Sequence, residues 1–356
     1  MKKWYGILLA VILTAALCAA GAEESPAEIR IPEGTEIPEE LQNPGDPVEL
    51  GSWGIPFAKA GDSTWYIYAY TEDNTLLGLT VYEPADPEAE NVILPEGVET
   101  MLPGFLKQLP NVKRVRIPAS VRTLSMECFA GAHRDFVIEC EAGSYAEKFA
   151  LQYGFQYDNG EKQVIGWQIS DPEEKAKWVV ANYIREDMTE REKARVLHNW
   201  IITNSHYWSD NDSGAAHESD TLLAEGWGVC EAYAFAYYRL LQETGMAAAW
   251  FSGGSIRDET TGHEWNLVRI DGQWYHVDCT WDDPTNGPPE APCVSGQENE
   301  LYFMKTDEEM AVNHSWDSDY SADKGRMFCY WDPDTKQEMV RDSWNTEFAY
   351  VPRDVY

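Results

Sequence analysis

The chain has few basic residues. Among its 356 residues, Lys and Arg number 27 and Asp and Glu number 61, which gives a formal net charge of −34 at pH 7. Nucleic acids and anionic lipid surfaces are bound by basic groups that neutralise phosphate, so neither is expected as a main partner. The 13% content of aromatic residues also excludes a mainly disordered chain. At roughly 150 residues per domain, the length predicts about two domains.

Several common site patterns are missing from the sequence. The seven cysteines include no Cys-x-x-Cys pair, no His and Cys cluster has zinc spacing, and no glycine-rich loop is suited to a phosphate group. Six cysteines remain if a leader containing Cys18 is removed, too few in about 330 residues for a disulfide scaffold. We therefore expect no cofactor and no metal ion.

Residues 1–22 have the features of a secretory signal peptide. Two lysines precede an almost entirely apolar run over residues 7–20, which is too short for a stable membrane span. Cleavage is predicted after Ala22, so the protein is expected to be secreted or associated with the cell surface, without a membrane span. A retained membrane anchor is the alternative. A lipoprotein signal at Cys18 is disfavoured because the bulky Leu17 precedes the cysteine.

Two different segments follow the signal. Residues 23–51 are rich in Glu and Pro and lack a hydrophobic period, which is typical of a linker. Residues 52–158 are predicted to form a small β-rich region. Its first strands are expected at 65–70 and 76–82, where β-branched and aromatic residues are frequent.

A weak internal repeat lies within this β-rich region. The segment ILPEGV at 93–98 recurs 23 residues later as RIPASV at 116–121, and Met101 and Leu124 follow at the same offset. A period in the twenties is typical of a solenoid of stacked short strands. The pattern resembles the leucine-rich repeats of bacterial surface proteins. That resemblance implies binding or spacing, with a surface or host protein as candidate partner; two unrelated proline-containing turns are the alternative.

Helix signals begin near residue 171. Asp171 before Pro172 predicts a helix start, and Thr189 with Glu192 forms a capping box that predicts a second helix. We expect these helices to belong to one domain over residues 159–356. The fold class expected for the whole chain is therefore α+β.

Cys230 is the first candidate for chemistry. Glycines at 226 and 228 favour a tight turn, and a helical run then continues to Thr244 before Gly245. This pattern predicts Cys230 at a helix N-terminus, where the dipole and the free N–H groups stabilise a thiolate and a developing oxyanion. A small buried cysteine is the alternative.

A base and an orienting acid are predicted on a hairpin that turns at Asp271-Gly272. If Ile270 pairs with Gln273, His263 and Asp278 become diagonal neighbours on one face, with backbones roughly 7–8 Å apart. An imidazole and a carboxylate at this separation can touch. The sequence thus predicts a nucleophile, a base and an orienting group, the arrangement of thiol acyl transfer.

These segments resemble the transglutaminase-like superfamily in its bacterial secreted branch. The similarity is carried by GWGVCEAYAFAYYRLLQETGM and by GHEWNLVRIDGQWYHVDCTWDDP, and YFM at 302–304 and HSWD at 314–317 resemble the family's tail. The resemblance implies a papain-like core, in which a cysteine helix packs on an antiparallel sheet. It also implies that Cys230 is the nucleophile, His263 the general base and acid, and Asp278 the residue that orients His263. Ala232 departs from the glycine of many relatives.

The expected function is cysteine-dependent acyl transfer or hydrolysis at protein amide or peptide bonds through a thioester. Protease, deamidase and transglutaminase activities share this machinery, and the substrate is expected to be a protein or peptide. A non-catalytic surface-binding or adhesion protein on the same scaffold is the alternative. Because every triad candidate follows residue 225, the repeat region is expected to be dispensable for thiol chemistry.

Two further sets of aromatic residues have candidate roles. Tyr207 and Trp208 are candidate second oxyanion donors, with ordinary packing as the alternative role. Trp227, Trp265 and Trp274 are candidate walls of a tunnel for an amine acceptor.

Overall fold

The computed structural model describes residues 57–59, 65–70, 76–83, 88–94, 96–101, 103–209, 214–255, 258–316, 326–340 and 349–351. The predicted signal peptide and the linker at 23–51 lie outside these residues. Among the helices within the described ranges, none is long and apolar enough to cross a bilayer.

The first described elements form a three-stranded antiparallel sheet in the order β1-β2-β3. These strands are Phe57–Lys59, Trp65–Tyr70 and Leu76–Glu83. The two strands predicted from the sequence at 65–70 and 76–82 are confirmed as β2 and β3, which pair with each other.

Four short strands then stack in parallel: β4 (Asn91–Ile93), β5 (Arg114–Arg116), β6 (Val137–Glu139) and β7 (Gln156–Asp158). Along the first three strands the paired residues are 23 apart, since Asn91 pairs with Arg114 and Arg114 pairs with Val137. The spacing of the sequence repeat is therefore the spacing of the stacked strands. The turns between strands carry 3-10 helices at Leu106–Gln108 and Met126–Phe129, and α3 (Tyr145–Tyr153) precedes β7.

The helices after β8 (Gln163–Val164) begin where the capping residues predict. Asp171 caps α4 (Pro172–Tyr183) by accepting a hydrogen bond from the Glu174 amide. Thr189 and Glu192 form a complete capping box at the start of α5 (Glu190–Asn204). These two predicted helices are confirmed. The other helices are α6 (Ser219–Glu225), α7 (Cys230–Glu243), α8 (Cys279–Asp282) and α9 (Asp307–Met310), with a 3-10 helix at Ala215–His217.

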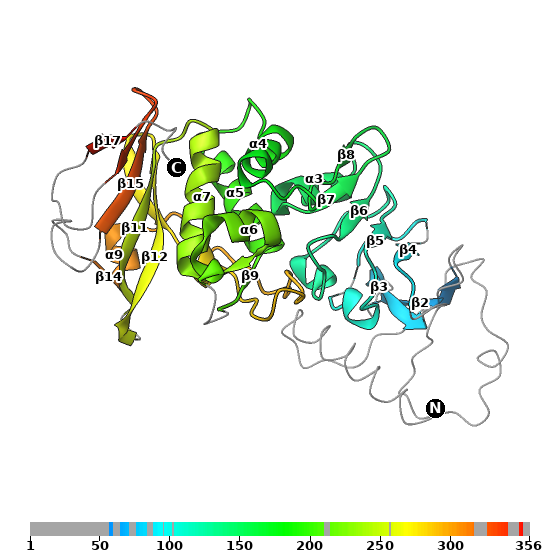
Figure 1. Ribbon diagram of the computed structural model, residues 1–356. Coiled ribbons are helices and arrows are strands. Elements are labelled where there is room, and N and C mark those ends of the chain that lie inside the picture. The colour runs from blue at the N-terminus through cyan, green and yellow to red at the C-terminus, as the bar shows by residue number, and fades with distance from the viewer. Residues whose placement is uncertain are drawn as a thin grey trace.

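A seven-stranded sheet forms the other end of the described molecule (Figure 1), with β14 paired to β11 and the remaining strands in the order β13-β12-β11-β15-β16-β17. Its strands are β11 (Ala248–Ser255), β12 (Asp258–Ile270), β13 (Gln273–Val277), β14 (His314–Ser315), β15 (Arg326–Asp332), β16 (Gln337–Val340) and β17 (Ala349–Val351). A separate two-stranded parallel ladder joins β9 (His206–Tyr207) to β10 (Trp227–Gly228).

The two faces of β12 contact different parts of the molecule. On one face, the Asn266 side-chain amide donates to the Ala234 carbonyl of α7 at 2.8 Å, and Val268 belongs to the main core. On the other face, Trp265 and Leu267 form a second apolar cluster with Met310 of α9. This alternation fixes α7 against the side of β12 that carries Asn266 and Val268, and it leaves Trp265 and Leu267 for the opposite side.

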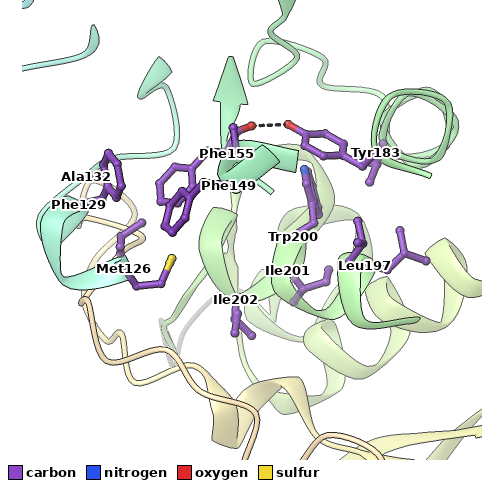
Figure 2. Close-up of a cluster of buried hydrophobic side chains, with 14 of the residues drawn as sticks. Met126, Phe129, Ala132, Phe149, Phe155, Tyr183, Leu197, Trp200, Ile201 and Ile202 are labelled. Atoms are coloured by element: carbon purple, nitrogen blue, oxygen red, sulfur yellow. Dashed lines mark hydrogen bonds between the residues drawn. The ribbon is translucent and has the colours of Figure 1, made fainter. Parts of the chain in front are cut away.

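The repeat strands and the helices share one hydrophobic core (Figure 2), in which Phe129, Phe149 and Phe155 lie in the same cluster as Trp200 of α5. The Tyr183 hydroxyl of α4 donates to the Phe155 carbonyl at 3.0 Å across this contact. Burial of apolar surface is the largest favourable contribution to folding, so both parts depend on this contact for stability.

Polar contacts join the same two parts. The guanidinium of Arg134, in the loop before β6, donates to the Leu223 and Ala224 carbonyls at 2.5 and 2.7 Å. These carbonyls lie in the last turn of α6, shortly before Cys230. They are among the C-terminal carbonyls that a helix leaves without an internal partner.

These contacts change one expectation drawn from the sequence. The proposed division between residues 158 and 159 falls inside the β7–β8 hairpin, where Asp158 pairs with Gln163. A truncated protein that begins near Gly160 would lose α3, β7 and Arg134, and would expose the face of α5 that carries Trp200. The stacked strands β4–β7 and their turns supply no triad residue, but they are part of the structure that holds the cysteine domain.

Substitution at Gly154 tests this shared core. Gly154 ends α3 with φ +77°, and a Cβ there would lie 2.5 Å from the Cα of Trp200. We expect Gly154→Ala to lower the free energy of unfolding by roughly 2–4 kcal/mol, because left-handed strain and overpacking add. Gly143→Ala is the matched control, since Gly143 has φ +78° with no atom within 4 Å of the added Cβ. Its expected cost is about 1 kcal/mol. Equal losses in urea unfolding would contradict close packing of α3 on α5.

Candidate active site

Cys230 is the first residue of α7 and is partly exposed. The N-cap residue, Val229, has no side chain that can accept a hydrogen bond, and its own N–H donates to the Ala216 carbonyl at 2.8 Å. The N-cap side chain therefore leaves the first amides of α7 uncapped, and they remain suited to a thiolate or an oxyanion. Ala232 is accommodated by Gly228: a Cβ on Gly228 would lie 2.6 Å from that of Ala232.

The predicted hairpin brings His263 to Asp278. Ile270 pairs with Gln273, as the sequence predicted, and the pairing of β12 with β13 continues to Asn266 and Val277. Asp271 and Gly272 both have positive φ, at 50° and 80°, as a type I′ turn requires. Nε2 of His263 lies 2.7 Å from Oδ2 of Asp278. The predicted contact between imidazole and carboxylate is therefore confirmed.

Asp278 is fully buried and accepts four hydrogen bonds. Oδ1 accepts from the amides of Thr280 and Trp281 at 3.0 and 3.2 Å, so the residue also caps α8. Oδ2 faces His263 and, at 3.0 Å, Nε2 of His314. Burial opposes the carboxylate, but the charges and hydrogen bonds of the two histidines hold the pKa of Asp278 below its usual range.

The side chain of His263 connects Asp278 to Cys230. Burial disfavours the imidazolium, but the charge and hydrogen bond of Asp278, followed by those of Cys230, raise the pKa of His263 to about 10. Because Nε2 faces Asp278, Nδ1 is the ring nitrogen left for the sulfur. The structure thus brings together all three predicted triad residues, and it favours the imidazolium form of His263 at neutral pH.

Two side chains beside the triad, Trp281 and His314, were not placed in the site from the sequence. The half-buried ring of Trp281 lies 5.4 Å from the ring of His263 and 4.3 Å from that of His314, measured between centroids. Both residues belong to segments that resemble family motifs, CTWDDP and HSWD, but these motifs did not indicate a place in the site. Nothing in their spacing indicated contact with Asp278.

The carboxylate and the two imidazoles also meet the distance criterion for a metal site. One ring nitrogen each of His263 and His314 and a carboxylate oxygen of Asp278 lie within 4.8 Å of one another. However, the contacts of 2.7 and 3.0 Å are hydrogen-bond lengths, whereas ligands bound to tetrahedral zinc at 2.0–2.1 Å are roughly 3.3 Å apart. We therefore interpret the three side chains as a hydrogen-bonded cluster.

The candidate oxyanion donors lie beside the cysteine turn. Tyr207 pairs with Gly228, and the Trp208 amide donates to the Gly228 carbonyl at 3.0 Å. Burial raises the pKa of Tyr207, and the neighbouring Cys230 adds to this rise. Both rings pack on the cluster of Ala216, Trp227 and Val229. Tyr207 is therefore the candidate that lies within electrostatic reach of the sulfur.

His276 has a packing role. The indole Nε1 of Trp265 donates to its Nδ1 at 2.8 Å, and its Nε2 lies 3.1 Å from a carboxylate oxygen of Asp307. Burial lowers the pKa of His276 to about 4, so the ring is neutral and its tautomer is fixed by these partners. It does not contact Asp278.

Comparison with known proteins identifies the domain around this site. Residues 178–279 match the family model of the transglutaminase-like superfamily, and the match includes Cys230, His263 and Asp278. The chain therefore carries a transglutaminase-like domain. The mixed helix and sheet architecture is consistent with the predicted α+β class and with a transglutaminase- or papain-like core. The match does not extend to residues 52–158.

Two solved structures show weaker similarity. One is a TGase, with 15% identity, a TM-score of 0.28, and coverage of 33% of this chain and 33% of that chain. The other is a candidate cysteine protease from Cytophaga hutchinsonii, with 17% identity, a TM-score of 0.28, and coverage of 51% of this chain and 55% of that chain. The chain thus spans about a third and about half of these two proteins. Among curated proteins, none matches it significantly.

The site predicts that Cys230 is the most reactive thiol. Burial raises the pKa of the other four cysteines with described side chains, to about 11 for Cys140 and about 12 for Cys293, and also for Cys128 and Cys279. We expect limiting iodoacetamide at pH 6 to label Cys230 at least about tenfold faster than any other cysteine. Because the imidazolium of His263 is lost only as the pH rises through about 10, its positive charge should assist labelling of Cys230 throughout the range from pH 6 to 9.

The label is mapped by mass spectrometry of peptides. Cys230→Ser is the control and should leave only slow labelling. Preferential modification of any other cysteine would remove the assignment of the nucleophile.

Proposed function

We propose that the protein is a secreted, transglutaminase-like cysteine enzyme that acts on protein amide or peptide bonds through a thioester on Cys230. One observation carries this proposal: Cys230, at an uncapped helix start, contacts His263, whose Nε2 lies 2.7 Å from the buried carboxylate of Asp278. A nucleophile, a base and an orienting acid in this order are the minimum machinery of thiol acyl transfer.

In the proposed reaction, the Cys230 thiolate attacks the carbonyl carbon and the carbonyl oxygen becomes an oxyanion. The amides that begin α7 stabilise this charge, and we propose the Tyr207 hydroxyl as the second donor. His263 donates its proton from Nδ1 to the departing amine, which leaves a thioester. An incoming water or amine then gives a proton to Nδ1 as it attacks the thioester, and Cys230 is released as thiolate. Asp278 keeps the ring oriented throughout.

Water is the acceptor that the surroundings favour. An amine acceptor must outcompete water, which needs a tunnel walled by exposed aromatic rings. Trp265 is 1% exposed and Trp227 is 7% exposed, and both belong to packing clusters. Neither is free to form such a wall, which supports hydrolysis over transfer.

Export and attachment complete the proposal. The features of residues 1–22 support secretion, and the stacked strands at 23-residue spacing support a leucine-rich-repeat type of region that binds a surface or host protein. The carboxyl-rich composition does not favour nucleic acid as a partner.

The direct test is to trap the acyl-enzyme. The protein without its leader is incubated with a peptide library, quenched in acid and analysed by mass spectrometry for an added acyl mass on Cys230. The added mass identifies the acyl group and hence the bond attacked. Cys230→Ala is the control. A wild-type protein that labels with iodoacetamide but forms no adduct with any library member would contradict the proposed activity.

Asp278→Asn tests the orienting role. The amide oxygen can still accept from Thr280 and Trp281, but the amide nitrogen would face two imidazole nitrogens that both donate to the carboxylate. His263 would then hold the wrong tautomer, so we expect the acylation rate to fall by about 10⁴-fold, the scale seen in a serine triad. The circular dichroism spectrum should be retained. An unchanged rate would show that Asp278 does not orient the base.

Hydrolysis and transfer are separated by competition. The acyl donor found in the trapping experiment is incubated with enzyme and a fluorescent primary amine at millimolar concentration. We expect release of the free acid to exceed amine incorporation. Dominant incorporation would make the protein a cross-linking enzyme instead.

A further inference from the structure

One oxygen of Asp278 serves two imidazoles. Oδ2 lies 2.7 Å from Nε2 of His263 and 3.0 Å from Nε2 of His314, and both histidines and the carboxylate are buried. His314 reaches this oxygen from β14, 36 residues beyond Asp278 in the chain. Its ring centroid is 5.4 Å from that of His263, so the two imidazoles are close neighbours.

Each ring nitrogen of His314 faces an oxygen atom. Nδ1 faces the side-chain oxygen of Asn313 at 2.8 Å, and the Asn313 side-chain nitrogen donates to the Tyr302 hydroxyl at 2.7 Å. Nε2 faces a carboxylate oxygen, which accepts. Both ring nitrogens of His314 thus face oxygen atoms that can accept, an arrangement that suits the form of histidine with two donors.

We propose that His314 is a positioning residue of the active site, which fixes the carboxylate of Asp278 and supplies the positive charge that makes the buried cluster neutral when Cys230 is a thiolate. The cluster then holds two negative groups, Cys230 and Asp278, and two imidazolium groups, His263 and His314. This inference rests on the proposed function, because it concerns how the same nucleophile is kept ionised.

Without His314, the same cluster would carry one net negative charge in a buried setting. A buried site disfavours an unbalanced charge, and the thiolate is the group that protonation can remove. Loss of His314 should therefore make protonation of Cys230 easier. The acidic limit of thiolate reactivity would move to higher pH.

The other titratable groups described around the site are either paired with a partner or uncharged. Burial, together with the nearby Glu231, raises the pKa of Glu264 to about 8, and the Trp250 indole donates to this carboxyl group at 2.6 Å, so Glu264 is mostly uncharged at neutral pH. Burial raises the pKa of Tyr207, so this phenol is neutral, and the Tyr302 hydroxyl accepts from the Asn313 side chain at 2.7 Å. Among the described residues, further groups on adjacent elements form pairs of their own: Glu231 with His217, Asp282 with His198, Asp283 with Tyr233, and His276 with Asp307.

The test measures alkylation of Cys230 by iodoacetamide between pH 4 and 9 in the full chain without its leader, with the site of labelling confirmed by mass spectrometry. His314→Gln keeps a side-chain donor for Asp278 but removes the charge, and His314→Ala removes both. We expect the pH below which alkylation of Cys230 slows to rise by about one unit in both variants. The Gln variant keeps the test valid if the Ala variant folds poorly.

His198→Gln is the matched control. His198 is equally buried, and it also has an Asn oxygen on Nδ1 and an Asp oxygen on Nε2, each at 3.0 Å, but its partner is Asp282 rather than Asp278. This variant should lose thermal stability while its pH profile remains that of the wild type. A histidine with a purely structural role at position 314 would behave in the same way.

Three results would overturn the inference. The first is a wild-type pH profile of alkylation in both His314 variants, and the second is the same shift of the profile in His198→Gln. The third is a shift in His314→Ala alone, because it would show that the charge of His314 is not the cause. Failure of the proposed function is distinguishable. In that case the wild-type protein itself would show no preferential alkylation of Cys230 in the acidic range.

Discussion

The buried carboxylate of Asp278 is the contact on which the site depends. One oxygen caps α8 through two amides, and the other binds two imidazoles from β12 and β14. A buried carboxylate is costly unless its lone pairs are filled, so the same four bonds that make the charge tolerable also fix the base. Structural stability and the orientation of His263 are therefore determined by the same group.

The order of these elements in the chain has consequences for assembly. The β12–β13 hairpin joins His263 to Asp278 across only 15 residues, which is a local contact of low entropic cost. Cys230 joins this pair only when α7 docks on the sheet, through contacts such as that of Asn266 with Ala234. His314 arrives last in sequence. The reactive thiol is thus activated only in a molecule whose sheet and helices have already come together.

The parts of the site that the sequence predicted are those set by local rules. The Asp271–Gly272 turn fixes the hairpin register, and the capping residues Asp171 and Thr189 fix two helix starts. The contact of His314 with Asp278 depends on the path of the chain between α8 and β14, which no periodicity encodes. The shared core of Phe129 and Trp200 was missed for a similar reason. A buried residue is recognisable in a sequence, but its partner across two layers is not.

Arg134 has an implication for how such a protein can vary. Its guanidinium joins the loop before β6 to the end of α6, close to the turn that presents Cys230. Here a breakpoint between the two parts would separate Arg134 from its two carbonyls and Phe155 from Tyr183. Only exchanges that preserve both sides of this contact would give working proteins, so insertions among the stacked strands would be tolerated at the β4 end, away from the cysteine.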